Sequence, residues 1–284
     1  MDKQQIILNN NDLNATIDKL GAQLLSLTKG NRELIWNGDP SFWKGHAPIL
    51  FPVCGGLING KYYFNGHEYE MSKHGFVRFR EFEVIGQSKN KVIFIYQSTN
   101  DDLKIYPFKF TFLVIYELTD QLNIRYEITN ESDVPMYFNV GSHEGYLLEK
   151  DFSSYHVEFE QNEKLMSSVT EGPLLSHNKI DYTKFGKNIP LRYEDYKVDA
   201  LVFENIKSKK AYLCCKKKRE IELSFPNAKH IVLWSIPNAK FICIEPWDGI
   251  HDYVDSPLNI KQKRSINVLL AHKTYTFTHS IKAL

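Results

Sequence analysis

Two ionisable side chains lie inside apolar stretches of the sequence, where a charge would be costly. Glu245 directly follows the run 241–244 in "FICIEPWDGI", and His143 lies within "NVGSHEGYLL". The run before Glu245 is typical of a strand that is buried on both faces. A carboxylate at that depth must be paired, hydrogen-bonded or neutral, because an isolated buried charge is strongly unfavourable. A glutamate and a histidine in such surroundings can both exchange protons near neutral pH.

His74 in "KHGFVRFREFEV" and Asp199 in "YKVDALVF" are two further ionisable residues in apolar or glycine-containing contexts. For each histidine, a hydrogen-bonded core residue is the alternative to a catalytic one. The compact metal signatures H-x-H, H-E-x-x-H and E-x-x-H are missing, which disfavours a metal site. A glycosidase with Asp199 and Glu245 as its carboxylate pair stays open, because the sequence does not give their separation. A serine nucleophile is disfavoured by the lack of a G-x-S-x-G turn.

The four cysteines are expected to be buried free thiols. They lie in strand-like contexts without C-x-x-C spacing, which argues against a zinc ribbon and a redox dithiol. They are Cys54, Cys214, Cys215 and Cys243.

The composition is that of an ordinary globular protein and predicts a small, neutral ligand. The chain has 284 residues, of which 43% are hydrophobic and 24% charged. Because 35 Lys and Arg balance 34 Asp and Glu, no overall basic field would recruit nucleic acid or an anionic membrane. The N-terminus has no basic leader with an apolar core, and no apolar run approaches the ~18 residues of a membrane helix. We therefore expect a cytoplasmic protein.

Short runs of β-branched and aromatic residues recur along the chain with turn signals between them. The clearest strands are expected at 91–99, 108–118 and 121–130, with a hairpin turn at Thr119 and Asp120. Helical candidates are short, at 39–45 and 181–186. No linker, low-complexity tract or repeat divides the chain. The pattern predicts an all-β fold with residues 1–284 as a single large domain.

Several segments, in this order, resemble the bacterial aldose 1-epimerases (galactose mutarotases), in particular their LacX-type branch. "PILFP" precedes "HGFVR", where that branch has P-I-L-F-P before H-G-F-A-R. "MYFNVGSHEGYLL" resembles its histidine strand G-G-H-P-x-F, and "VDALVFENI" resembles N-D-A-L-x-F. "VLWSIPNAKFICIEPWDGIHD" resembles W-S-x-P followed by C-I-E-P-W-x-G, which is the most specific segment. The resemblance covers the chain from about Trp36 to the C-terminus.

The resemblance implies a galactose mutarotase-like β-supersandwich of antiparallel strands and an isomerase that interconverts sugar anomers without a metal or organic cofactor. Carried over position by position, the general base falls on Glu245 and the general acid on His143. The substrate-binding positions that it implies are His74, Asp199, Arg78 and Trp247. A structural ion pair is the alternative for Arg78, and core packing is the alternative for Trp247. The remaining tryptophans, Trp36, Trp43 and Trp234, are expected in the core.

Two positions depart from the branch. Gly56 in "FPVCGGL" stands where an arginine usually follows the glycine of F-P-x-x-G-R, and Glu144 replaces the proline after the histidine. We expect the Glu144 side chain to point to solvent. The leading interpretation is that the protein is a mutarotase in carbohydrate metabolism, and that its substrate is a free hexose or a related aldose. A hexose-6-phosphate 1-epimerase and a non-catalytic sugar-binding or sensing protein are the alternatives, and monomer and homodimer both stay open.

Overall fold

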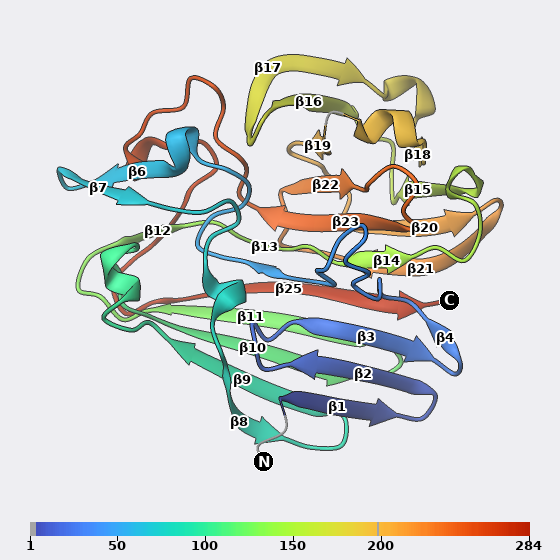
Figure 1. Cartoon of the computed structure of the whole chain (residues 1–284), viewed down its shortest axis with the longest axis horizontal. Coiled ribbons are helices and arrows are strands. Elements are labelled where there is room, and N and C mark those ends of the chain that lie inside the picture. The colour runs from blue at the N-terminus through green and yellow to red at the C-terminus, as the bar shows by residue number, and fades with distance from the viewer. Residues whose placement is uncertain (1–3, 198) are drawn as a thin grey trace.

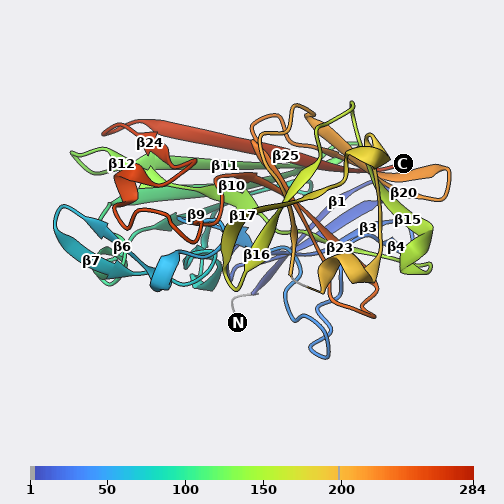
Figure 2. The ribbon, with the colours of Figure 1, turned by 90° about the horizontal axis from the view of Figure 1, so that it is seen from above.

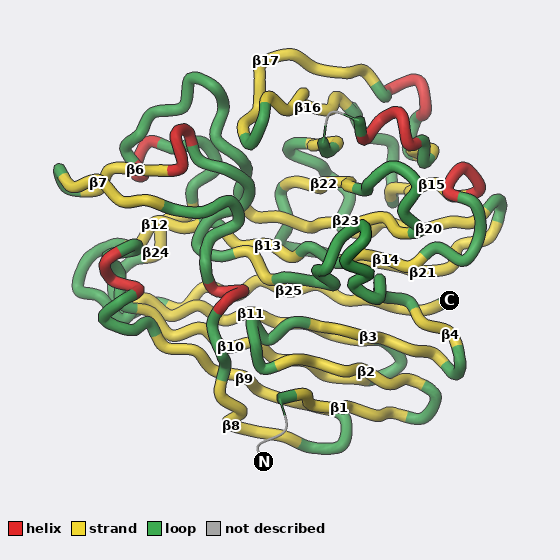
Figure 3. The backbone as a smooth tube through the Cα atoms, viewed as in Figure 1, coloured by secondary structure: helices red, strands yellow, loops and turns green. Residues whose placement is uncertain are grey.

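The computed structural model describes residues 4–197 and 199–284, which form β-strands, short 3₁₀ helices and connecting loops (Figure 3). The first three residues and Val198, which falls within the "YKVDALVF" segment, lie outside the described residues. Among the described residues, no α-helix occurs, and no helix is long and apolar enough to cross a membrane.

The largest sheet has nine strands, and the C-terminal strand lies in it between strands from the first half of the chain and strands from the second half. In spatial order these strands are β18 (Asn188–Pro190), β15 (Tyr155–Phe159), β20 (Lys210–Cys215), β21 (Lys218–Ser224), β25 (Thr274–Ala283), β11 (Leu122–Asn130), β10 (Phe110–Leu118), β9 (Lys91–Gln97) and β8 (Glu83–Gln87). All pairings in this sheet are antiparallel.

A second large sheet has eight strands and lies in the upper half of the molecule in Figure 1. In spatial order they are β17 (Leu174–Asp181), β16 (Met166–Glu171), β19 (Leu201–Phe203), β22 (His230–Trp234), β23 (Phe241–Asp248), β13 (Val140–Ser142) and β5 (Ile49–Leu50), with β14 (Gly145–Leu147) also paired to β23. Seen from above, β25 and β11 run along one side of the molecule and β23 and β16 lie toward the other (Figure 2).

Three smaller sheets complete the strand structure. One is formed by β1 (Gln5–Asn10), β2 (Leu13–Asp18), β3 (Leu24–Lys29) and β4 (Arg32–Glu33), the second by β12 (Met136–Phe138) and β24 (Asn267–Leu269), and the third by β6 (Lys61–Phe64) and β7 (His67–Glu70). The four-stranded sheet is tied to the nine-stranded sheet by the Tyr116 hydroxyl, which donates to the carbonyl of Ala22 at 2.7 Å.

The 3₁₀ helices are single turns within the connections. They are η1 (Ile58–Gly60), η2 (Val77–Phe79), η3 (Asp102–Lys104), η4 (Phe152–Ser154), η5 (Thr183–Phe185), η6 (Tyr193–Tyr196) and η7 (Ile260–Gln262). The segment 181–186 thus contains the expected short helix, but 39–45 does not. There the expectation was wrong, because residues 40–42 form a turn that the Asp39 side chain closes by accepting from the Ser41 amide.

Strand β23 is apolar throughout because both of its faces are covered. Ile242 and Ile244 point into the main hydrophobic core between the sheets, whereas Cys243, Glu245 and Trp247 point to the opposite face. All eight residues of β23 are buried. A continuous apolar run is therefore what this position in the sheet requires.

Most sequence expectations about strands are confirmed. The runs 91–99, 108–118 and 121–130 contain β9, β10 and β11, and the last two pair as a hairpin closed by Leu118 opposite Leu122. The main hydrophobic core includes residues from β1 to β25. The four cysteines are free thiols, but Cys215 is only half-buried, because it ends β20 beside an exposed turn.

Candidate active site

His143 and Glu245 face each other because two short strands share one register against β23. In β13, Gly141 lies opposite Trp247, and in β14, Gly145 lies opposite Cys243. Residues 143 and 144, between β13 and β14, do not pair with β23, but the two strands on either side keep the same register. His143 therefore lies opposite Glu245. Side chains at opposed positions of antiparallel strands project from the same face.

The gap in the ladder coincides with Pro246. A proline has no amide hydrogen to donate, so a central strand tolerates it only where a neighbour is interrupted. The Nε2 atom of His143 lies 3.5 Å from Oε2 of Glu245, a contact too long for a good hydrogen bond. His143 Nδ1 and Glu245 Oε2 have no hydrogen-bond partner among the described residues. Both side chains therefore keep hydrogen-bonding capacity for a ligand.

Burial shifts the pKa values of this pair in opposite directions. Removal from water raises the pKa of Glu245 well above its ordinary value, and nearby Asp199 and Glu144 add to the effect against the opposing charge of Lys73. Burial lowers the pKa of His143 to about 3. When the pair carries one proton, that proton consequently lies on the carboxyl group, and both side chains are neutral.

His74 is held in a defined orientation by the backbone of Gly55. The Gly55 amide donates to His74 Nδ1 at 3.1 Å, and the His74 amide donates to the Gly55 carbonyl at 2.8 Å. Because burial keeps the pKa of His74 well below its usual value, the ring is neutral and its proton lies on Nε2. The ring of His74 lies edge-on to that of His143, with centroids 5.5 Å apart. His74 can therefore donate a hydrogen bond into the site.

Asp199 lies in a bend before β19 and pairs with a lysine from the turn that carries His74. Its Oδ2 is 3.3 Å from Lys73 Nζ, and its φ of 106° is unusual for a residue with a side chain. A terminal nitrogen of Arg78 donates to the Lys73 carbonyl at 2.8 Å, and burial lowers the Arg78 pKa. Arg78 thus braces the turn and also lines the site.

Aromatic rings form the walls around the pair. Trp43 stacks on His143, with ring centroids 5.0 Å apart and planes at 29°. Trp234 approaches His143 edge-on at 5.6 Å, and Trp247 approaches His74 edge-on at 5.6 Å. The expectation that Trp43 and Trp234 are ordinary core residues was wrong, because both line a cleft beside the histidine.

These side chains surround a cleft of about 280 Å³ on the outer face of the eight-stranded sheet. This volume is at the small end for ligand pockets. All six site residues that the sequence predicted line it: Glu245, His143, His74, Asp199, Arg78 and Trp247. The sequence analysis missed Trp43, Trp234 and His251 as site residues, and these also line the cleft, as does Lys73. His251 lies six residues after Glu245 in "EPWDGIHD", which was its one signal in the sequence.

Glu144 does not point to solvent, so that expectation was also wrong. The residue is 2% exposed, and its carboxylate lies 2.8 Å from Nε2 of His279 on β25. The Ser142 hydroxyl donates to its other oxygen at 2.7 Å. Neighbouring strand residues point to opposite faces, so while His143 faces the cleft, Glu144 reaches inward across the sandwich.

Gly56 has no room for the arginine that the resemblance would place there. A Cβ atom on Gly56 would lie 2.5 Å from the Pro173 carbonyl oxygen, which belongs to the turn between β16 and β17. Backbone at that distance leaves no space for any side chain.

Two clusters offer atoms that a metal ion could use. His143, Cys243 and Glu245 present ligand atoms within 4.8 Å of one another, and His156, Glu158 and Cys214 form a second group. Burial and the nearby Glu245 keep the Cys243 pKa well above its usual value, so its thiol stays protonated. Because metals bind the thiolate, this disfavours a metal beside the acid–base pair.

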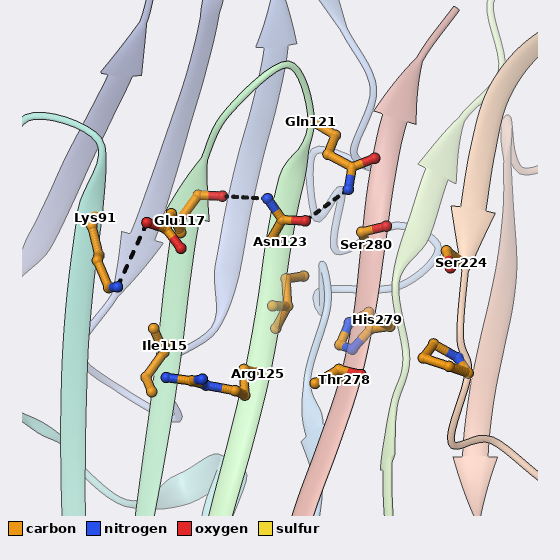
Figure 4. A pocket seen from close by; sticks show the side chains of 12 residues that line it. Lys91, Ile115, Glu117, Gln121, Asn123, Arg125, Ser224, Thr278, His279 and Ser280 are labelled. Carbon is orange, nitrogen blue, oxygen red and sulfur yellow. Dashed lines mark hydrogen bonds and ion pairs between the residues drawn. The ribbon is translucent and has the colours of Figure 1, made fainter.

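A larger hollow of about 380 Å³ lies on the outer face of the nine-stranded sheet (Figure 4). Its polar side chains satisfy one another: Lys91 pairs with Glu117 at 3.6 Å, and the Asn123 amide donates to the Glu117 carbonyl at 3.3 Å. The His279 side chain is turned away to Glu144. Because this hollow lacks a buried acid facing a base among its lining residues, the cleft at Glu245 is the better candidate for chemistry.

Comparison with known proteins agrees with this geometry. The family model described as Aldose 1-epimerase matches residues 4–282. The plasmid-encoded protein LacX of Lactococcus lactis subsp. lactis is 28% identical over 296 residues, covering 98% of this chain and 99% of the relative. Its chromosomal counterpart from the same organism is also 28% identical, with the same coverage.

Two solved structures share the whole fold. A galactose mutarotase related enzyme from Lactobacillus acidophilus superposes with a TM-score of 0.93 at 28% identity, covering 99% of this chain and 97% of the other. A galactose mutarotase-like protein from Lactobacillus casei gives a TM-score of 0.93 at 29% identity, covering 99% and 100%. The expected galactose mutarotase-like architecture of antiparallel strands is thereby confirmed.

Proposed function

Because the chain belongs to the aldose 1-epimerase family, we propose that it interconverts the α and β anomers of a free hexose or a related aldose. One observation carries the proposal: His143 and Glu245 lie opposite each other on neighbouring strands, 3.5 Å apart, in a buried cleft. A reversible ring opening needs an acid and a base on the same side of the sugar. This pair supplies both from one sheet face.

Ring opening transfers two protons and breaks one bond. The Glu245 carboxylate takes the proton of the C1 hydroxyl while the His143 imidazolium protonates the ring oxygen, and the C1–O5 bond breaks to leave an aldehyde. Rotation about C1–C2 exposes the other face of the carbonyl, and closure reverses both transfers. The pair holds one proton throughout, and only the residue that carries it changes.

The pKa shifts favour one half of this cycle. Burial places the single proton on Glu245, which is the state that closes the ring. The opening state has the proton on His143. The nearby ammonium of Lys73 lowers the pKa of both side chains, so it does not select between the two states. A reversible acid–base cycle requires two states of similar energy, so we propose that the bound sugar stabilises the opening state.

The remaining cleft residues are proposed to bind and orient the sugar. His74 Nε2 donates toward the ring oxygen, and Asp199 accepts from sugar hydroxyls beside Lys73. Arg78 supports the Lys73 turn and donates at the cleft edge, and Trp247 covers an apolar C–H face of the ring. We propose that the whole chain, residues 1–284, acts as one cytoplasmic domain in carbohydrate metabolism with these side chains alone.

A hexose-6-phosphate 1-epimerase is the second candidate. Lys73 and Arg78 both line the cleft, and a phosphate needs at least two cationic groups at one edge. However, the Lys73 ammonium is already paired with Asp199 at 3.3 Å. This pairing favours the free sugar, because a phosphate would have to displace Asp199.

The test follows the equilibration of freshly dissolved α-D-glucose and α-D-galactose by polarimetry or NMR. We expect wild type to exceed the buffer rate, and Glu245→Gln to remove about 10²–10⁴-fold of the enzymatic rate. The matched control is Glu117→Gln, which makes the same chemical change on the outer face of the nine-stranded sheet and should retain activity. Equal rates for wild type and buffer with free sugars, but not with their 6-phosphates, would favour the second candidate. Equal rates with both, accompanied by sugar binding, would favour a non-catalytic sugar-binding protein.

A further inference from the structure

The space near Gly56 is filled by a histidine from elsewhere in the chain. A side chain at Gly56 is excluded by the Pro173 carbonyl, and a Cβ on Gly55 would lie 2.2 Å from Cγ of His251. Gly55 thus leaves room for the His251 ring, and Gly56 leaves room for the Pro173 carbonyl that contacts it. A position where the LacX-type branch usually has a cationic fork presents an imidazole here.

The His251 ring is seated through one of its two nitrogens. Its Nδ1 lies 3.0 Å from the Pro173 carbonyl oxygen and 3.2 Å from the Gly56 amide nitrogen. Its ring lies 5.2 Å from that of Trp247 and 6.3 Å from that of His74, measured between centroids. Nδ1 therefore anchors the ring, which lies beside the rings of Trp247 and His74.

That opposite edge is unsatisfied. His251 is 2% exposed and lines the cleft, and its Nε2 has no hydrogen-bond partner in the described part of the chain. Leaving a buried polar atom without a partner is unfavourable. Burial lowers the pKa of this histidine to about 4, so at neutral pH it offers an uncharged hydrogen-bonding group. A hydroxyl suits such a group in either tautomer, because it both donates and accepts.

The backbone that carries His251 is fixed on both sides. Gly249 turns the chain out of β23 with a φ of 146°, and a Cβ there would lie 2.2 Å from Asn139. Asp252 donates its amide to the Gly56 carbonyl at 2.9 Å, and its carboxylate accepts from the buried ammonium of Lys263 at 2.5 Å. A binding group needs such support to hold its geometry.

We propose that His251 Nε2 is a specificity contact that hydrogen-bonds one hydroxyl of the bound sugar, near the place where the arginine usually stands. The inference rests on the proposed function, since it names a further contact of the same cleft. It also selects the substrate class: the part of the sugar that faces His251 carries a neutral hydroxyl rather than a phosphate. If the ring only positioned its neighbours, the buried Nε2 atom would stay without a hydrogen-bond partner, which is unfavourable.

The test combines variants of His251 with sugars that each lack one hydroxyl. Wild type, His251→Asn and His251→Gln are compared on the sugar that wild type turns over fastest and on its 2-, 3-, 4- and 6-deoxy forms. Asparagine retains a polar group near Nδ1 and loses Nε2, whereas glutamine extends toward the Nε2 position. With the full sugar, we expect His251→Asn to raise KM about tenfold with kcat little changed, and His251→Gln to restore part of the loss.

One deoxy sugar should reveal the partner hydroxyl. For that sugar alone, wild type and His251→Asn should have the same KM, because the contact is already missing. If His251→Asn weakens every sugar by the same factor, the side chain is structural and the inference is wrong. Should His251→Asn fail to fold, a ¹⁵N NMR titration of wild type replaces the variant, with the Nε2 resonance of His251 as the signal. It should shift with the full sugar and not with that one deoxy form, and an unshifted resonance overturns the inference.

The outcome separates the two proposals. If wild type does not speed mutarotation of any sugar, the proposed function fails. The same NMR titration then decides whether His251 still binds a sugar hydroxyl, because it measures binding without turnover.

Discussion

The acid–base pair at Glu245 and His143 makes a specific prediction about pH. In the proposed mechanism, catalysis needs one proton on the pair, so activity should fall when His143 gains a second proton or when Glu245 loses the shared one. Burial lowers the pKa of His143 to about 3 and raises that of Glu245. We therefore expect kcat/KM to show no acid-side inflection near pH 6.5, where an ordinary histidine titrates, and to fall as the pH rises through the Glu245 pKa.

Polarimetry with the buffer rate subtracted at every pH measures this profile, because free sugars also equilibrate by acid and base catalysis. Circular dichroism at each pH is the control for folding. If folded protein lost activity on the acid side with a midpoint near pH 6.5, His143 would titrate like an ordinary histidine. The prediction that burial lowers its pKa would then be wrong.

Gly56 should tolerate no side chain. In Gly56→Ala, the new Cβ would meet the Pro173 carbonyl at 2.5 Å, and backbone must move to relieve the contact. Overpacking of this kind typically costs about 1–3 kcal/mol, so we expect a loss of that size in the free energy of unfolding from urea titrations. Gly86→Ala is the control, since its Cβ would meet only Ile93 at an ordinary 3.4 Å. Equal stability of the two variants would refute the steric account.

The sequence predicted the residues with recognisable motifs and missed those defined only by packing. Glu245, His143, His74 and Asp199 stood in unusual apolar contexts, and all four line the cleft. His251 was missed because its role depends on the space left at Gly55, which no local pattern reveals. The direction of Glu144 was predicted wrongly because a buried partner 135 residues away, on another sheet, cannot be inferred from neighbouring residues.

Strand β25 and the β13–β14 segment are joined across the sandwich by Glu144 and His279. Both side chains are at most 3% exposed, with 2.8 Å between Oε1 and Nε2. Removal of one partner from a buried pair typically costs about 3–5 kcal/mol, because the other is left uncompensated. We expect Glu144→Ala to lower the free energy of unfolding by that amount, and the double variant Glu144→Ala/His279→Ala to lose less than the sum of the two single variants.

The control is Glu117→Ala, which removes the partner of Lys91 from the outer surface (Figure 4). Such exposed pairs contribute about 0–1 kcal/mol, so stability should change little. If the losses at Glu144 and His279 simply add, the two side chains do not stabilise each other, and the sheets are held by apolar packing alone.

Strands with strict alternation were predictable, but the loop that bears Trp43 was not. Strand β9 alternates half-exposed and buried residues between β8 and β10, and its pattern stands out in the sequence. In 39–45, Asp39 favours a helix start and a turn equally well. The turn prevails because the Trp43 carbonyl accepts from the Trp36 indole at 2.7 Å, and the Trp43 ring covers His143. Tertiary contacts of this kind override local propensity.

Convergence of the cleft residues is a property of the whole sandwich. His74 and Glu245 are far apart in sequence, and the sheet order brings them together through β5, β13 and β23. Composition and pattern predicted an all-β fold, and motif order predicted its family. The sugar itself was not predictable, because specificity depends on a few hydrogen-bonding groups whose positions only the folded chain defines.

Burial of histidines, in the cleft and elsewhere, should make the stability of the folded protein depend on pH. Four histidines combine deep burial with a lowered pKa in the described chain: His74, His143, His230 and His251. Below pH 6.5, these histidines bind protons in the unfolded chain but stay neutral in the folded protein. The stability that they contribute is therefore complete above this pH and is lost as the pH falls. Each buried histidine lowers the free energy of unfolding by about 1.4 kcal/mol per pH unit below pH 6.5. Glu245 opposes them, because its raised pKa makes the folded state bind the extra proton above pH 4.5.

The four histidines outweigh Glu245, so we expect a net loss of roughly 4 kcal/mol between pH 7.5 and 5.5, measured from urea unfolding at each pH. His230 offers a clean check, because it is fully buried and does not line the cleft. His230→Gln removes one titrating group, so its stability should depend less steeply on pH, by about 1.4 kcal/mol per unit below pH 6.5. A slope that this substitution leaves unchanged would mean that His230 does not contribute to the acid sensitivity, whereas the ion-paired carboxylates Glu158 and Glu204, whose folded pKa values are about 2, lose their contribution only below about pH 4.5.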